Sequence, residues 1–234
     1  MTRVKLIWIL LIIPLVLALS NCAGQRYIAG RQFLLEGRSE SPGYGLYSYI
    51  LFSKAPSEHT LEAYISVIES YLSSIQKIEE LQKYIRRDSL NIVYLPLKVD
   101  TQIEFNNLDL RQQAQWLLDN YDYARATVYL AKFPENLSNG PYLVSHTKPL
   151  SRVNSVLSEY IIQDMGNVHH RVVSLWVKSF LEQTAKAEFW DGQHLSRFAH
   201  ELRNIIAIAA DGLGEVTDSI SWWRTKLSEW IVQK

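Results

Sequence analysis

The hydrophobic positions of this chain fall into short apolar runs and longer stretches with helical spacing. Residues 45–53 are rich in aromatic and β-favouring side chains and are apolar on both faces, which is typical of a central strand covered on both sides. Residues 90–99 predict a second strand, where Pro96 cannot donate a ladder hydrogen bond and therefore indicates an edge or a bulge. Residues 142–145 predict a third, short strand.

Helical periodicity accounts for most of the remaining chain. Apolar side chains recur at three- and four-residue intervals from Leu61 to Ile85, which predicts one amphipathic helix of about seven turns. The next helix can be capped by Asp109 and ends before Pro134. Further helices are expected over about 151–161, 168–187, 191–210 and 216–231.

This order of elements predicts an α+β fold in which helix dominates. We expect a small sheet of about three short strands, packed by amphipathic helices, and a helical C-terminal half. Residues 44–234 are numerous enough for one well-buried core and are expected to form a single globular domain. Residues 22–43 contain several glycines and serines and suit a flexible tether, although four apolar side chains there can dock on the domain. These four are Tyr27, Phe33, Leu34 and Leu35.

The N-terminal segment has the layout of an export signal. A basic start, residues 1–5, precedes the apolar run 6–19, which is shorter than the roughly 20 residues of a spanning helix. Leu19, Ser20 and Asn21 then lead to Cys22. This arrangement resembles the signal peptide and lipobox of bacterial lipoproteins, in which the cysteine becomes the lipidated first residue, although Asn21 stands where that family usually has a small residue.

The resemblance implies a signal peptide over residues 1–21, lipidation of Cys22 and attachment to a membrane of the bacterial cell envelope. Ala23 after the cysteine implies the outer membrane, facing the periplasm. Two alternatives remain open from the residues alone: ordinary signal cleavage nearby, for example after Gly24, or retention of the segment as an anchor.

Charge and cysteine content exclude several classes of protein. The whole chain has 24 basic and 24 acidic side chains, and loss of residues 1–21 removes Arg3 and Lys5 and leaves 22 basic and 24 acidic. Such a balance argues against a nucleic-acid partner, which needs clustered Lys and Arg. Because Cys22 is the only cysteine, the chain has no intramolecular disulfide and no cysteine-based zinc site.

Four tyrosines on the strand candidates are the best, though weak, candidates for ligand binding. These are Tyr47, Tyr49, Tyr94 and Tyr142. Their hydroxyls can line a pocket for a sugar, a lipid or a peptide, and the alternative is that they fill the interface between sheet and helices. Asp119, Asp122 and Arg125 recur at three-residue spacing, which favours an ion-pair surface and leaves a binding role as the alternative.

Motifs of known catalytic sites are missing. Gly-X-Ser-X-Gly does not occur, and the neighbouring Ser145 and His146 need convergence in space to act together. The spacing of His169, His170, His194 and His200 is poor for a metal site, so we expect no metal, no cofactor and no catalytic residue.

Together these patterns predict an exported, membrane-anchored lipoprotein with a non-enzymatic role in binding or in a protein complex of the envelope. The alternative is an envelope enzyme, a hydrolase, whose site includes residues such as His146, His169 and His170.

Overall fold

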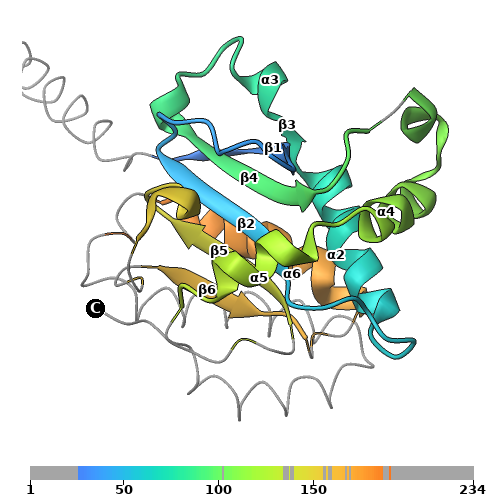
Figure 1. Ribbon diagram of the computed structural model, residues 1–234. Helices are drawn as coiled ribbons and strands as arrows, with labels where there is room; N and C mark the ends of the chain where they lie inside the picture. Colours follow the sequence, from blue (N-terminus) through green and yellow to red (C-terminus); the bar gives the residue numbers. More distant parts are fainter. Residues whose placement is uncertain are drawn as a thin grey trace, which may run out of the picture.

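The computed structural model describes residues 26–186 and 190, apart from 102, 134–136, 138–139, 155–156, 158–159, 167 and 169. A six-stranded mixed sheet forms its centre (Figure 1). The strands are β1 (Ile28–Leu35), β2 (Leu46–Phe52), β3 (Gln76–Lys77), β4 (Leu90–Leu97), β5 (Pro141–His146) and β6 (Ile161–Asp164). They lie in the order β3-β1-β4-β2-β5-β6.

The first four strands of that order are parallel, and the last two bring antiparallel pairing. β4 lies between β1 and β2, and all eight residues of β1 pair with β4, from Ile28 opposite Leu90 to Leu35 opposite Leu97. β5 runs against β2 and β6 against β5. Every residue of β2, β4 and β5 is buried, as expected for strands that are covered on both faces.

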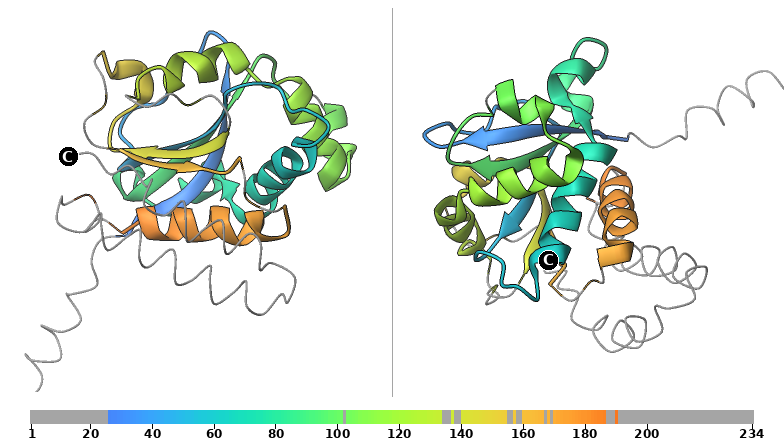
Figure 2. Two further views of the ribbon diagram at one scale, coloured as in Figure 1. Left: turned by 90° about the horizontal axis from the view of Figure 1, so that it is seen from below. Right: turned by 90° about the vertical axis from the view of Figure 1, so that its right-hand side faces the viewer.

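Helices cover both faces of the sheet. They are α2 (Leu61–Ser74), α3 (Ile78–Leu81), α4 (Leu110–Asp119), α5 (Tyr123–Leu130) and α6 (His170–Thr184), with short 3-10 helices η1 (Arg87–Ser89), η2 (Ile103–Asn107) and η3 (Leu150–Arg152). Figure 2 shows α6 and α5 on opposite sides of the sheet. The side with α2 and α6 buries Trp176 and Phe180, and Phe52 stacks on Tyr64 of α2 with ring centroids 4.7 Å apart.

The predicted fold class was wrong in the number of strands and in the balance of helix and strand. Six strands form the sheet, and β6 begins at Ile161, the last residue of the helix expected over about 151–161. β1 lies within the segment expected to be a flexible tether, and its Phe33 and Leu34 pack on the core. Pairing with β4 along its whole length forms this strand, although its own side chains are mostly half-buried.

Two predicted helices are interrupted where backbone groups join the sheet. The helix expected through Ile85 ends at Ser74, because Gln76 and Lys77 pair with Gly30 and Arg31 of β1. The Arg31 side chain also donates to the Ile75 carbonyl oxygen at 2.8 Å. The next helix begins as predicted, with Asp109 in a capping box with Gln112, but divides into α4 and α5.

The break between α4 and α5 explains why Pro96 is accepted in an interior strand. Pairing of β2 with β4 ends at Tyr49 opposite Tyr94, so Pro96 lies beyond it. Residues 120–122 take the place of β2 there: Lys98 donates to the Asn120 carbonyl oxygen at 2.9 Å, and Asp122 donates to that of Pro96 at 3.2 Å. The sequence predicted an edge or a bulge at Pro96. β4 as a whole is an interior strand, but Pro96 itself lies beyond the last residue pair of β2 and β4.

Strands β2, β4 and β5 and helix α6 confirm the corresponding segment predictions. The helices expected after residue 190, and the export signal with Cys22, lie outside the described residues.

Candidate functional site

Three of the four candidate tyrosines converge beneath the connection between β1 and β2. Because β4 separates these two parallel strands, residues 36–45 must cross over it. The Tyr94 hydroxyl accepts a hydrogen bond from the Ser41 N–H at 2.9 Å. The Tyr47 hydroxyl donates to the Ser41 carbonyl oxygen at 3.3 Å and accepts from the Tyr44 N–H at 3.2 Å. These hydroxyls therefore fasten the crossing segment to the sheet.

A buried carboxylate lies at the centre of this cluster. Glu40 is 3% exposed, and its Oε1 accepts hydrogen bonds from the Tyr49 hydroxyl and the Ser151 N–H, both at 3.1 Å. The Tyr49 hydroxyl in turn accepts from the Leu150 N–H at 3.0 Å. Glu40 and Tyr49 thus join the crossing segment, β2 and η3.

Electrostatics keep the carboxylate charged and the phenols protonated. Burial raises the pKa of Glu40, but hydrogen bonds from the side chain and backbone of Ser151, its own backbone and the Tyr129 hydroxyl outweigh it, so the pKa lies below its ordinary value. Burial, followed by the negative charge of Glu40, raises the pKa of Tyr49 well above its ordinary value. The same two causes raise the pKa of Tyr129. The cluster therefore consists of one anion and neutral donors.

The rings fill the space around the carboxylate. The Tyr49 ring lies 5.8 Å from that of Tyr94 and 5.6 Å from that of Tyr129, the latter in an edge-on arrangement. The fourth candidate, Tyr142, lies opposite Leu51 on β5 and packs over Gly140, where a Cβ atom would come within 2.7 Å of its ring. The hydroxyls of Tyr47, Tyr49 and Tyr94 are thus engaged by the chain itself.

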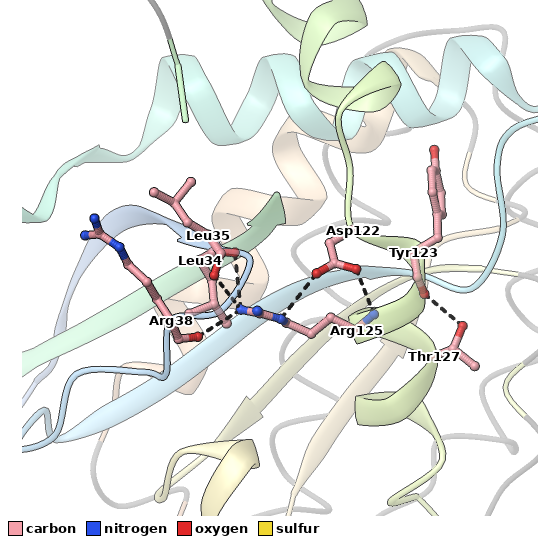
Figure 3. Close-up of polar contacts among 7 residues, drawn as sticks. All are labelled: Leu34, Leu35, Arg38, Asp122, Tyr123, Arg125 and Thr127. Atoms are coloured by element: carbon pink, nitrogen blue, oxygen red, sulfur yellow. Dashed lines mark hydrogen bonds and ion pairs between the residues drawn. The ribbon is translucent and has the colours of Figure 1, made fainter. Parts of the chain in front are cut away.

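Asp122 and Arg125 form a second polar cluster, at the carboxyl end of β1 (Figure 3). Asp122 caps α5 by accepting from the Arg125 N–H at 2.9 Å, and its other oxygen lies 3.4 Å from the Arg125 Nε. Arg125 also donates from one terminal nitrogen to the carbonyl oxygens of Leu35 at 2.9 Å, Arg38 at 3.1 Å and Leu34 at 3.4 Å.

The expected ion pair therefore exists, but it is not a solvated surface. The side chains of Arg125 and Asp122 are only 15% and 10% exposed. Asp119 is separate from it and accepts a hydrogen bond from Gln115 on the exposed side of α4 at 2.9 Å. The pair holds α5 against the start of the crossing segment, which the spacing of residues in the sequence did not reveal.

Ser145 and His146 point to opposite faces of β5, as adjacent strand residues do. The Ser145 Oγ lies 2.7 Å from the Ser48 Oγ, which donates to the Asn91 Oδ1 at 2.9 Å. The His146 Nδ1 lies 2.9 Å from the Lys148 N–H that donates to it. These neighbours therefore form no Ser–His pair. No cluster of three or more His, Cys, Asp or Glu side chains suited to a metal ion occurs among the described residues. His169, His194 and His200 lie outside them.

The first described residues lie beside the end of α6. Arg26 forms a β-bridge with Lys186, and the Tyr27 N–H donates to the Ala185 carbonyl oxygen at 2.8 Å. β1 begins at Ile28, six residues after Cys22. In the described part of the chain, no helix combines the length and apolarity needed to cross a membrane.

Comparisons with protein families, curated proteins and solved structures found no match to this chain.

Glu40 is the residue of this site that sequence reasoning missed. It lies in a segment of Gly, Ser and Pro whose composition indicates a loop, and its burial comes from the tyrosines that meet it. Its neighbours in the sequence give no signal for such contacts.

Proposed function

We propose that this protein is an exported lipoprotein of the bacterial cell envelope, held on a membrane by a lipid on Cys22, whose α/β domain acts by binding. The observation that carries the proposal is the basic start and apolar run that end just before the only cysteine. An apolar run of this length suits an export signal and is short for a spanning helix.

The distance between Cys22 and the sheet sharpens the proposal. Only four residue steps separate Cys22 from Arg26, which forms a β-bridge with Lys186, and an extended chain covers at most about 14 Å in four steps. A lipid on Cys22 would therefore hold the sheet directly at the bilayer surface. Because β1 begins at Ile28, much of the segment that the composition indicates as a tether belongs to the domain instead.

The binding role is supported by polar side chains that form hydrogen bonds within the domain and hold its segments together. The hydroxyls of Tyr47 and Tyr94 bond backbone groups of the crossing segment, and Arg125 bonds three carbonyl oxygens at the end of β1. These contacts rigidify the domain, and a rigid scaffold suits surface contacts with a partner because little conformational entropy is lost on association.

The lipid is tested by expressing the full chain in a bacterium and measuring the mass of its N-terminal peptide. We expect a diacylglycerol-modified Cys22, accumulation of the uncleaved precursor with the signal-peptidase inhibitor globomycin, and membrane fractionation that is lost in Cys22→Ser. An unmodified thiol at Cys22 would overturn the lipoprotein assignment. Turnover of ester, peptide or glycoside substrates by the purified protein, absent after heat denaturation, would contradict the binding role.

A further inference from the structure

At one end of the strands, the sheet lies next to Arg26 and Tyr27, where the described part of the chain begins. β1, β2 and β4 all begin there, β5 ends there, and α6 ends beside them. Gly45 marks how closely these segments approach: a Cβ atom on it would lie 2.2 Å from the Asp88 carbonyl oxygen and 2.3 Å from the Tyr27 ring. We call this the entry edge.

Among the described residues, basic side chains outnumber acidic ones at the entry edge. The cations on segments that flank these strand ends are Arg26, Arg86, Arg87, Lys148 and Lys186. Two of the described acids lie beside them: Asp88 is paired with Arg86, whose side chain remains 84% exposed, and Glu79 lies near Tyr44, over whose ring Arg87 is placed. Glu182, in the last turn of α6, lies 3.9 Å from Lys178.

The opposite ends of the strands have a different balance of charge. Exposed charges next to the other ends of the same strands are mixed in sign: Arg38, Lys54, Lys98, Glu36, Glu58 and Asp100. The two edges are separated by the length of the strands, which for the seven residues of β2 is about 20 Å. Positive charge is therefore concentrated at the entry edge, whereas charges of both signs lie at the opposite ends of the strands.

We infer that the entry edge is the membrane-facing surface of the domain and that it binds anionic phospholipid headgroups. This inference rests on the proposed function, because the short connection to a lipidated Cys22 places this edge at the bilayer. Charge complementarity supplies the second reason, since each Lys or Arg near an anionic bilayer strengthens binding about fivefold. The strands then stand away from the membrane, with the edge around Glu36 and Lys98 directed outward.

The orientation is tested with two reporter cysteines on the lipidated full chain, whose own Cys22 thiol would be blocked by the lipid. Thr147 follows the end of β5 at the entry edge, and Ala55 follows the end of β2 at the opposite edge. Both side chains are exposed. Thr147→Cys and Ala55→Cys proteins carry the same fluorophore and are reconstituted into phosphatidylcholine vesicles containing phosphatidylglycerol and a lipid with a nitroxide on its headgroup.

We expect much stronger quenching of the label at position 147 than of the label at position 55. Adding Arg86→Gln and Lys148→Gln should reduce that difference, whereas Lys54→Gln and Lys98→Gln at the opposite edge should leave it unchanged. Equal quenching at the two positions, or the reverse order, would overturn the orientation.

Failure of the proposed function is recognised separately, by the mass of the N-terminal peptide. If Cys22 proves unmodified, flotation of the full chain with the same vesicles decides the headgroup inference. Binding that requires phosphatidylglycerol and weakens about thirtyfold in the Arg86→Gln, Lys148→Gln protein supports it. Absence of binding, or binding that ignores the anionic lipid, overturns it.

Discussion

The Tyr121 hydroxyl donates a hydrogen bond of 2.9 Å to the carbonyl oxygen of Ile50, and so spans the point where β2 and β4 separate. The same hydroxyl accepts from the Phe52 N–H at 3.1 Å. A side chain from the segment between α4 and α5 thereby satisfies two backbone groups of β2 that no longer face β4. Burial raises the pKa of Tyr121 well above its ordinary value, which keeps its proton available.

Tyr121→Phe should destabilise the domain by about 1–3 kcal/mol, because it leaves a buried N–H and a buried carbonyl oxygen without a partner. Urea denaturation followed by circular dichroism measures this change. Tyr84→Phe, at a side chain that is 89% exposed, is the matched control and should leave the urea concentration at the midpoint of unfolding unchanged. Equal midpoints for the wild type and Tyr121→Phe would show that the bridge is not needed.

Glu40→Gln should change how stability depends on pH. The folded-state pKa of Glu40 lies below its ordinary value, so the charged carboxylate stabilises the fold above the unfolded-state pKa of about 4.3. That contribution is lost as the pH falls through the lower folded-state pKa. The free energy of unfolding of the wild type should therefore drop more steeply below about pH 5 than that of Glu40→Gln, so their difference narrows in acid.

Urea denaturation at a series of acid pH values measures the free energy of unfolding of both proteins, and so the difference between them. Glu36→Gln, at an exposed carboxylate four residues earlier, serves as the control and should run parallel to the wild type. The same dependence of the free energy of unfolding on pH in the wild type and in Glu40→Gln would contradict a charged, hydrogen-bonded Glu40.

Gly45→Ala should cost about 1–3 kcal/mol through overpacking. Its Cβ would lie 2.2 Å from the backbone oxygen of Asp88, which cannot move without displacing the start of β4. Gly37→Ala separates steric overlap from backbone strain, because Gly37 has φ +74° but open space around it. Thermal denaturation of both variants measures the two effects, and an unchanged melting temperature for Gly45→Ala would rule out the close approach.

Arg125→Gln should destabilise the domain by about 1.5–3 kcal/mol, since it removes charged hydrogen bonds to the end of β1. Hydrogen exchange should also increase in residues 36–45, the segment that Arg125 fastens. Arg111→Gln, which removes a solvent-exposed ion pair with Glu62, is the control and should have little effect. Unchanged exchange in the crossing segment of Arg125→Gln would argue that the pair is incidental.

Strong local patterns predicted the elements that sequence alone can specify. The continuous apolar runs of β2 and β5 and the helical stripe of α6 each form the element expected. Asp109 caps α4 because a cap depends on residues within one turn. Tyr47, Tyr49 and Tyr94 lie on strands, as predicted, but their meeting beneath the crossing segment was not predicted.

Elements made by distant pairing were not predictable in this way. β1 and β3 lack a strong strand pattern and exist because their backbones bond to β4 and to each other. The breaks at Ile75 and at residues 120–122 likewise serve pairings with strands far away in the sequence. Periodicity continued across both breaks, since side chains on either side still pack on one core.

The sequence by itself determined the candidate export signal, the solitary Cys22, the near-balance of charge and the strands and helices with strong periodicity. Only the tertiary structure decided the six-stranded order, the burial of Glu40 and the gathering of cations at the edge where the chain enters. The physical reason is that periodicity and charge are local properties of a chain. Strand order and burial depend instead on which distant backbone and side-chain groups satisfy one another when water is removed.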